Sequence, residues 1–163
     1  MSGLALATGH SSPLSTTPAA SAVPLTTDLF FQELQMLALI IDDSRAMRRV
    51  LRRIVEPLGF TVIEGEHGQD GLDQLAKYNH DVDLILVDWN MPVMDGLTFV
   101  KTLRSNKDIP RITTVMVTTE TEPAQMARAL MAGVDEFVMK PFTAEVLIEK
   151  LQLIGVAIEN PAC

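Results

Sequence analysis

The residues best placed to do chemistry are carboxylates that directly follow apolar runs. Asp42 and Asp43 follow the run Met36–Ile41, and Asp88 follows Leu84–Val87. Continuous apolar runs of this kind are typical of strands buried in a parallel sheet. Because the carboxyl ends of such strands lie at one edge of the sheet, the three carboxylates are expected to meet there.

Two further polar residues are expected at this edge, Thr118 at the end of the run 112–118 and Lys140 after the run 136–139. Three neighbouring carboxylates repel one another, so a counter-charge is expected. Oxygen ligands suit Mg²⁺, whereas the sequence lacks the clustered His or Cys that bind zinc. A carboxylate can attack phosphorus to form an aspartyl phosphate, and the metal and Lys140 would offset charge on the transferring group.

Strands and helices alternate along the chain. Strands are expected at 36–41, 60–64, 82–88, 112–118 and 136–139, each followed by a helix. The last helix is expected to begin after Thr143 and to reach Ile158, because apolar residues recur at helical spacing up to that point. The pattern predicts an α/β fold, a doubly wound, five-stranded parallel sheet with helices on both faces.

The flanks differ from this region in composition. Residues 1–27 contain no charged side chain and are rich in Ser, Thr, Ala and Pro, which indicates a disordered N-terminal tail. A signal peptide is disfavoured because a basic segment is missing, and a translation start placed too far upstream is an alternative. Residues 28–35 are expected to form a short lead-in, helical or not, that packs on the domain or docks a partner. Residues 159–163 are expected to form a C-terminal tail.

Bulk properties exclude several classes of protein. The 163-residue chain is 47% hydrophobic and carries a formal net charge of −8, which disfavours nucleic-acid binding. No apolar run is long enough to span a membrane, and a single cysteine suits the reducing cytoplasm. The only dense basic cluster is interpreted as the solvated face of one helix: Arg45, Arg48, Arg49, Arg52 and Arg53.

These motifs, taken in order, resemble the receiver domain of two-component response regulators. The resemblance covers residues 36–158 and is closest to stand-alone, CheY-like members. It implies a flavodoxin-like sheet in the order 2-1-3-4-5. The motifs that carry it are Asp42-Asp43, Asp88-Trp89-Asn90-Met91-Pro92, Met94-Asp95-Gly96, Thr118 and Lys140-Pro141-Phe142.

The resemblance implies a role for each acidic residue. Asp88 would accept a phosphoryl group from a phosphohistidine on a sensor histidine kinase. Asp43 and Asp88 would ligate Mg²⁺ directly, together with the backbone carbonyl of Asn90. Asp42 would hold the metal through water.

The resemblance also implies how phosphorylation is sensed. Thr118 and Lys140 would bind the phosphoryl oxygens, and the Lys140–Pro141 bond would be cis. Phe137 occupies the family's aromatic switch position, coupled to movement of Thr118, although it lacks the hydroxyl of the tyrosine in CheY.

Three residues flank the acceptor and are expected to tune its rates. Thr119 stands where a small residue is usual, so it would crowd access to Asp88. Asn90 and Glu120 match CheY and favour fairly quick loss of the phosphoryl group.

The leading hypothesis is a phosphoacceptor switch rather than an enzyme, with self-catalysed phosphoryl transfer and autodephosphorylation. Few residues follow the last helix, so a monomer is expected to signal through its own surface, formed by the fourth helix, fifth strand and fifth helix, in a pathway such as chemotaxis. One alternative is a phosphorylation-independent adaptor on the same fold. Another is a phosphatase of the haloacid dehalogenase type, which needs an Asp where Asn90 stands.

Overall fold

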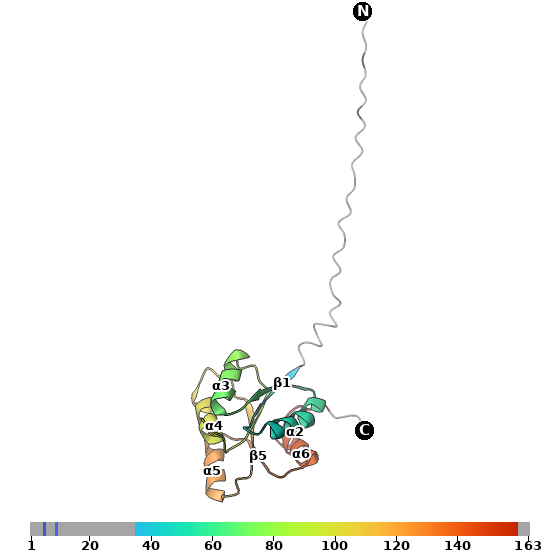
Figure 1. Ribbon diagram of the computed structural model, residues 1–163. Coiled ribbons are helices and arrows are strands. Elements are labelled where there is room, and N and C mark those ends of the chain that lie inside the picture. The colour runs from blue at the N-terminus through green and yellow to red at the C-terminus, as the bar shows by residue number, and fades with distance from the viewer. Residues whose placement is uncertain (1–4, 6–8, 10–34, 160–163) are drawn as a thin grey trace, which may run out of the picture.

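The computed structural model describes Ala5, Gly9 and residues 35–159 (Figure 1). The described residues leave out most of the N-terminal tail, residues 28–34 of the proposed lead-in at 28–35, and residues 160–163. Within residues 35–159, strands and helices alternate from the first strand to the last helix: β1 Met36–Ile41, α2 Arg45–Val55, the 3₁₀ turn η1 Glu56–Leu58, β2 Phe60–Gly65, α3 Gly68–Lys77, β3 Leu84–Val87, α4 Gly96–Ser105, β4 Thr113–Thr118, α5 Pro123–Ala132, β5 Glu136–Met139 and α6 Ala144–Leu153.

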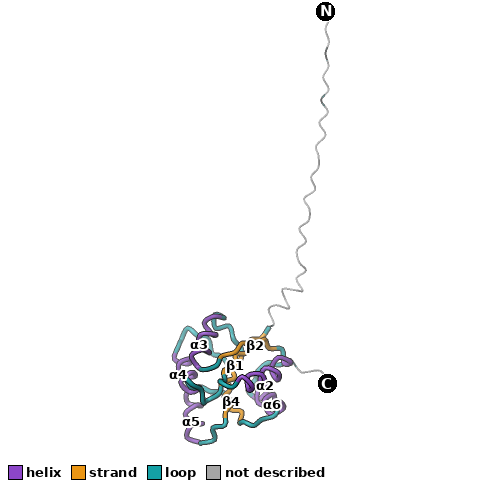
Figure 2. Tube along the Cα trace, in the orientation of Figure 1, coloured by secondary structure: helices purple, strands orange, loops and turns teal. Residues whose placement is uncertain are grey.

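The five strands form one parallel sheet in the order β2-β1-β3-β4-β5, which confirms the predicted order. Helices α3, α4 and α5 lie on one side of the sheet and α2 and α6 on the other (Figure 2). Each strand must therefore bury both faces, which explains why the strands read as continuous apolar runs.

The core has two halves, one on each face of the sheet. Alternate residues of β1 enter different halves: Leu39 and Ile41 pack on the α3–α5 side, and Ala38 and Ile40 on the α2–α6 side. This alternation follows from the two-residue repeat of a strand. Helices pack on both faces of the sheet, so the residues at its carboxyl edge are held in fixed positions.

The prediction that the last helix reaches Ile158 is wrong. Helix α6 ends at Leu153, because Gly155 adopts a left-handed conformation with φ of 79°. The amide of Val156 donates to the carbonyl of Leu151, and that of Gly155 donates to Gln152, the hydrogen bonds of a Schellman motif. Ile158 still packs partly against the core, but from an irregular segment.

Candidate functional site

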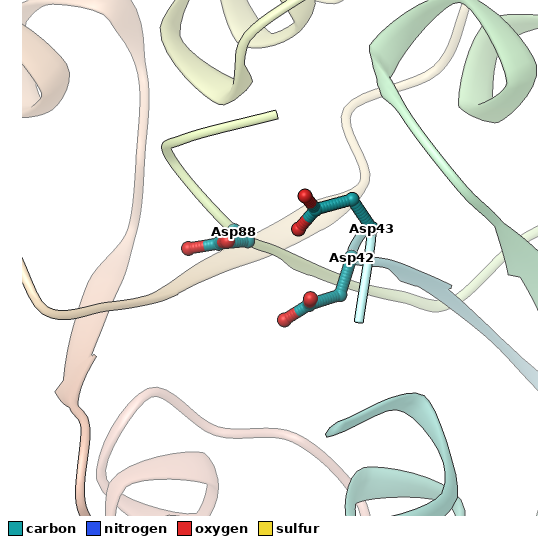
Figure 3. A group of neighbouring side chains, drawn as sticks. All are labelled: Asp42, Asp43 and Asp88. Atoms are coloured by element: carbon teal, nitrogen blue, oxygen red, sulfur yellow. The ribbon is translucent and has the colours of Figure 1, made fainter. Parts of the chain in front are cut away.

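The strand register places the acidic residues side by side. Ile41 of β1 pairs with Val87 of β3, so Asp42 and Asp88, the next residue of each strand, lie level at the carboxyl edge. One oxygen from each of Asp42, Asp43 and Asp88 lies within 4.8 Å of the other two. Figure 3 shows the three carboxylates extending to the same side. The structure therefore assembles the predicted acidic cluster.

Lys140 directly follows β5, an edge strand of the sheet, and completes the cluster. Its Nζ lies 2.8 Å from Oδ2 of Asp42 and 3.5 Å from Oδ1 of Asp88. Its backbone amide donates to the carbonyl of Thr118, and the Lys140–Pro141 bond is cis, as predicted. The ammonium is thus a fixed positive charge between two buried carboxylates.

The first two carboxylates have different surroundings. Asp42 is only 1% exposed, and its two oxygens accept hydrogen bonds from the Ser44 amide and from Lys140. Asp43 is exposed to solvent. Of this pair, Asp43 is the better placed to ligate a cation directly, whereas Asp42 would have to give up a partner to do so.

Asp88 is buried at the centre of the cluster. Its Oδ1 accepts a hydrogen bond of 2.8 Å from the amide of Trp89. Burial raises the pKa of Asp88 above its ordinary value, and the neighbouring Asp42 acts in the same direction, while Lys140 opposes both. The ionised form of Asp88 is therefore disfavoured in the folded protein, and a bound divalent cation would stabilise it.

The loop after β3 is fixed against the site by a glycine. A Cβ at Gly96 would lie 2.1 Å from the carbonyl oxygen of Asp88, so no other residue fits without moving the loop. The amide of Gly96 also donates to the carbonyl of Trp89. Asn90 lies exposed in this loop. Asp95 caps α4, since its side chain accepts a hydrogen bond from the amide of Thr98.

Of the predicted switch residues, Thr118 ends β4 and Phe137 is the second residue of β5. Thr118 is completely buried, and its hydroxyl oxygen accepts a hydrogen bond from the amide of Glu120. Phe137 is 5% exposed and packs in the core on the α3–α5 side, in register with Met116. Thr119 is exposed and Glu120 half-buried. No role of these residues follows from their placement alone, so each remains a prediction.

The interpretation of the arginine cluster as one solvated face is wrong for two of its members. Arg45, Arg49 and Arg53 are exposed, but Arg48 is 6% exposed and Arg52 is half-buried. Arg48 shares the buried stripe of α2 with Leu51 and Val55, at a spacing of three and four residues. The position of Arg48 three residues before Leu51 was the sequence feature that indicated its burial. The interpretation based on the arginine cluster did not use it.

The donor set fits a hard divalent cation. The three side chains that could act as ligands, Asp42, Asp43 and Asp88, all offer carboxylate oxygens, which suit Mg²⁺ and not zinc. Within residues 35–159, no other three His, Cys, Asp or Glu side chains bring ligand atoms within 4.8 Å of one another. The acidic cluster is therefore the candidate metal site of the described part of the chain.

A parallel sheet in this order, with three carboxylates and a lysine at its carboxyl edge, defines a CheY-like receiver domain. Residues 38–152 match the family model described as the response regulator receiver domain, and the chain belongs to that family.

Relatives and solved structures agree with this assignment. The chain is 45% identical over 118 residues to a chemotaxis protein CheY homolog of Campylobacter jejuni, a match that covers 72% of this chain and 90% of the relative. It is 42% identical over 120 residues to the chemotaxis protein CheY1 of Helicobacter pylori, covering 73% and 96%. The structure of Vibrio cholerae CheY4 superposes with a TM-score of 0.67 at 31% identity, covering 74% of this chain and 98% of that one.

No helix within the described residues is both long and apolar enough to cross a membrane.

Proposed function

We propose that this receiver domain is a phosphoacceptor switch in which Asp88 takes a phosphoryl group from a phosphohistidine on a sensor histidine kinase. The observation that carries the proposal is the meeting of Asp42, Asp43 and Asp88 within 4.8 Å, with Lys140 among them. A carboxylate oxygen of Asp88 attacks phosphorus, the phosphorus–nitrogen bond breaks, and its electron pair returns to the imidazole of the donor.

The acidic cluster is proposed to hold Mg²⁺. Asp43 and Asp88 ligate it directly, the backbone carbonyl of Asn90 is a third ligand, and Asp42 acts through water. Support comes from the exposure of Asp43 and from the two partners that already occupy Asp42. When bound, the ion supplies positive charge to the phosphoryl oxygens.

Chain residues provide the remaining charge and the readout. Lys140 carries a compact positive charge at the site, suited to a phosphoryl oxygen. Thr118 donates its hydroxyl to another oxygen, and its movement changes the position of Phe137. Phosphorylation then shifts a two-state equilibrium of the domain instead of building a new structure.

The proposed output surface is formed by α5, β5 and α6. Leu130 and Met131 of α5 are 53% and 89% exposed, and Leu153 of α6 is 73% exposed. A hollow of about 450 Å³ lies beside β5 and α6 and is lined in part by Val146 and Lys150. The apolar part of that lining, which includes Phe142 and Val146, suits a protein partner. The relatives named as chemotaxis proteins favour a chemotaxis pathway, and we propose that this protein is a cytoplasmic monomer.

The test is phosphorylation with a small-molecule phosphodonor in Mg²⁺, read by mass spectrometry of the intact protein. We expect one added phosphoryl group on the wild type and none on Asp88→Asn. Absence of labelling in the wild type, or equal labelling of the variant, would contradict the proposal. We also expect loss of the label without added phosphatase, since the domain itself is proposed to catalyse both steps and to have no other substrate.

The alternative is an adaptor that works without phosphorylation. It predicts that partner binding is the same for the wild type, Asp88→Asn and the protein treated with a phosphoryl mimic. The presence of all three carboxylates and Lys140 disfavours it, because an adaptor has no use for a mutually repelling acidic cluster with two buried members.

A further inference from the structure

Arg48 lies behind the acidic cluster, with its guanidinium almost completely enclosed. Its side chain is 7% exposed and makes contacts in three directions. Nη1 donates to the backbone carbonyl of Asp42 at 2.8 Å, Nε donates to Glu64 at 2.9 Å, and Nη2 lies 3.4 Å from Glu66. One planar group therefore joins the turn after β1 to β2 and to the loop that follows β2.

The carbonyl that Arg48 holds belongs to the peptide unit between Asp42 and Asp43. A peptide unit is rigid and planar, so fixing its oxygen also fixes its orientation. The orientation of that unit sets the direction in which both side chains leave the backbone. Arg48 thus acts on the two carboxylates without touching either carboxylate group.

The two glutamates hold the guanidinium in place from the other side. Glu64 accepts from both Arg48 and Arg52, and these hydrogen bonds lower its pKa although burial works to raise it. Arg52 lies one turn further along α2 and also pairs with Glu56, but the structure records no contact between Arg52 and Asp42. Both arginines lie on α2 and donate to Glu64, but only Arg48 also donates to the carbonyl of Asp42.

We propose that Arg48 is a positioning residue for the metal site, which orients the Asp42–Asp43 peptide unit by a buried hydrogen bond to the Asp42 carbonyl. This inference rests on the proposed function, since it assumes that the acidic cluster binds Mg²⁺. Residues that orient metal ligands from behind commonly change metal affinity by about 10- to 100-fold when they are removed.

Whether replacement of Arg48 weakens or tightens Mg²⁺ binding shows whether the residue acts by positioning the ligands or only through its charge. Arg48 is a cation near a cation site, so removing its charge alone would tighten Mg²⁺ binding. Loss of a positioning contact has the opposite effect and weakens binding. A residue with only a structural role would lower thermal stability and leave the dissociation constant of Mg²⁺ unchanged.

The experiment titrates Mg²⁺ into the full chain without phosphodonor and follows the fluorescence of Trp89. Trp89 is the single tryptophan, and its amide donates to Asp88, so the signal originates at the site. We expect Arg48→Met to weaken Mg²⁺ binding by about tenfold or more. The matched control, Arg52→Met, loses the same charge and the same Glu64 partner, and we expect it to bind as tightly as the wild type or slightly more tightly.

Arg48→Lys separates positioning from failure to fold. An ammonium keeps the charge but lacks the fork that reaches three acceptors at once, so its affinity should lie between those of the wild type and Arg48→Met. Thermal unfolding without metal shows which variants are folded. Unchanged or tighter binding by folded Arg48→Met overturns the inference. If that variant does not fold, wild-type affinity in Arg48→Lys overturns it. A wild type that binds no Mg²⁺ refutes the metal site itself.

Discussion

Lys140 lies closer to Asp42 than to Asp88, the proposed phosphoacceptor: its Nζ is 2.8 Å from Oδ2 of Asp42 and 3.5 Å from Oδ1 of Asp88. Asp42 is 1% exposed and needs this partner, because an unpaired buried carboxylate is costly. The lysine therefore stabilises the empty site through one carboxylate while remaining within reach of the other. An incoming phosphoryl group on Asp88 would compete with Asp42 for the same ammonium.

Replacing Lys140 should separate the stability of the fold from the affinity for metal. Lys140→Met leaves Asp42 buried without its ion pair, and we expect the free energy of unfolding in EDTA to fall by about 3 kcal/mol. Mg²⁺ binding should tighten, because a competing cation has been removed. Urea unfolding with and without Mg²⁺ measures both effects.

Lys150→Met is the control for this experiment. Lys150 pairs with Glu136 at 3.1 Å, but the two side chains are 32% and 26% exposed. A pair of this kind contributes at most about 1 kcal/mol. If the two lysine variants lose equal free energy of unfolding, the buried pair of Lys140 with Asp42 contributes no more than the exposed pair of Lys150 with Glu136.

Neutralising Asp88 should stabilise the metal-free domain at neutral pH. The pKa of Asp88 is raised in the folded state, chiefly by burial, so folding favours its protonated form. Its contribution to stability is full below the unfolded pKa of about 3.9 and is lost as the pH rises through the raised folded value. Asn mimics the protonated acid, and Asp88→Asn should therefore unfold at a higher temperature than the wild type at pH 7.

The advantage of Asp88→Asn should shrink as the pH is lowered toward the unfolded pKa. Thermal unfolding in EDTA over a series of pH values measures it, with the exposed Asp81 replaced by Asn as the control. A gain that is independent of pH, or equal for both variants, would contradict the explanation.

Gly96 should be indispensable for the shape of the site. A Cβ at this position would meet the Asp88 carbonyl oxygen at 2.1 Å, so Gly96→Ala must displace the loop that carries Asn90. We expect a loss of about 1–3 kcal/mol, as for other overpacked positions, together with weaker Mg²⁺ binding.

Gly155→Ala provides the comparison. Gly155 has a φ of 79° and nothing within 4 Å of its Cβ position, so alanine there costs about 1–2 kcal/mol for the left-handed backbone alone. We expect it to destabilise α6 without changing Mg²⁺ affinity. A measured affinity that falls equally in both variants would show that the metal site responds to general loss of stability.

Thr119 is predicted to slow the phosphorylation of Asp88 by crowding its approach. The side chain is exposed and follows the buried Thr118 directly. We expect Thr119→Ala to be labelled faster by a small phosphodonor, with unchanged Mg²⁺ affinity, because the metal ligands are untouched. Stopped-flow fluorescence of Trp89 measures the rate. If Thr119→Ala is labelled as fast as the wild type or more slowly, Thr119 does not slow the phosphorylation of Asp88.

The sequence by itself determined the order of the strands along the chain, the start of the last helix after Thr143 and the carboxylates of the site. These features are local, because an apolar run followed by Asp predicts a strand end wherever the run folds. The end of α6 differs from the prediction for a local reason as well, since apolar residues recur at helical spacing past Gly155 as far as Ile158, although the helix ends at Leu153.

Only the tertiary structure decided which partner each charge has. Lys140 lies 98 residues from Asp42 in sequence, and Arg48 meets Glu64 across 16 residues. The spacing along α2 indicates that Arg48 is buried, but no local pattern predicts its partners, because the distance between charges far apart in sequence is set only when the sheet and helices pack. A cluster of arginines that reads as one solvated face was therefore divided by the fold, and Arg48 was placed behind the acidic residues that the sequence had already identified.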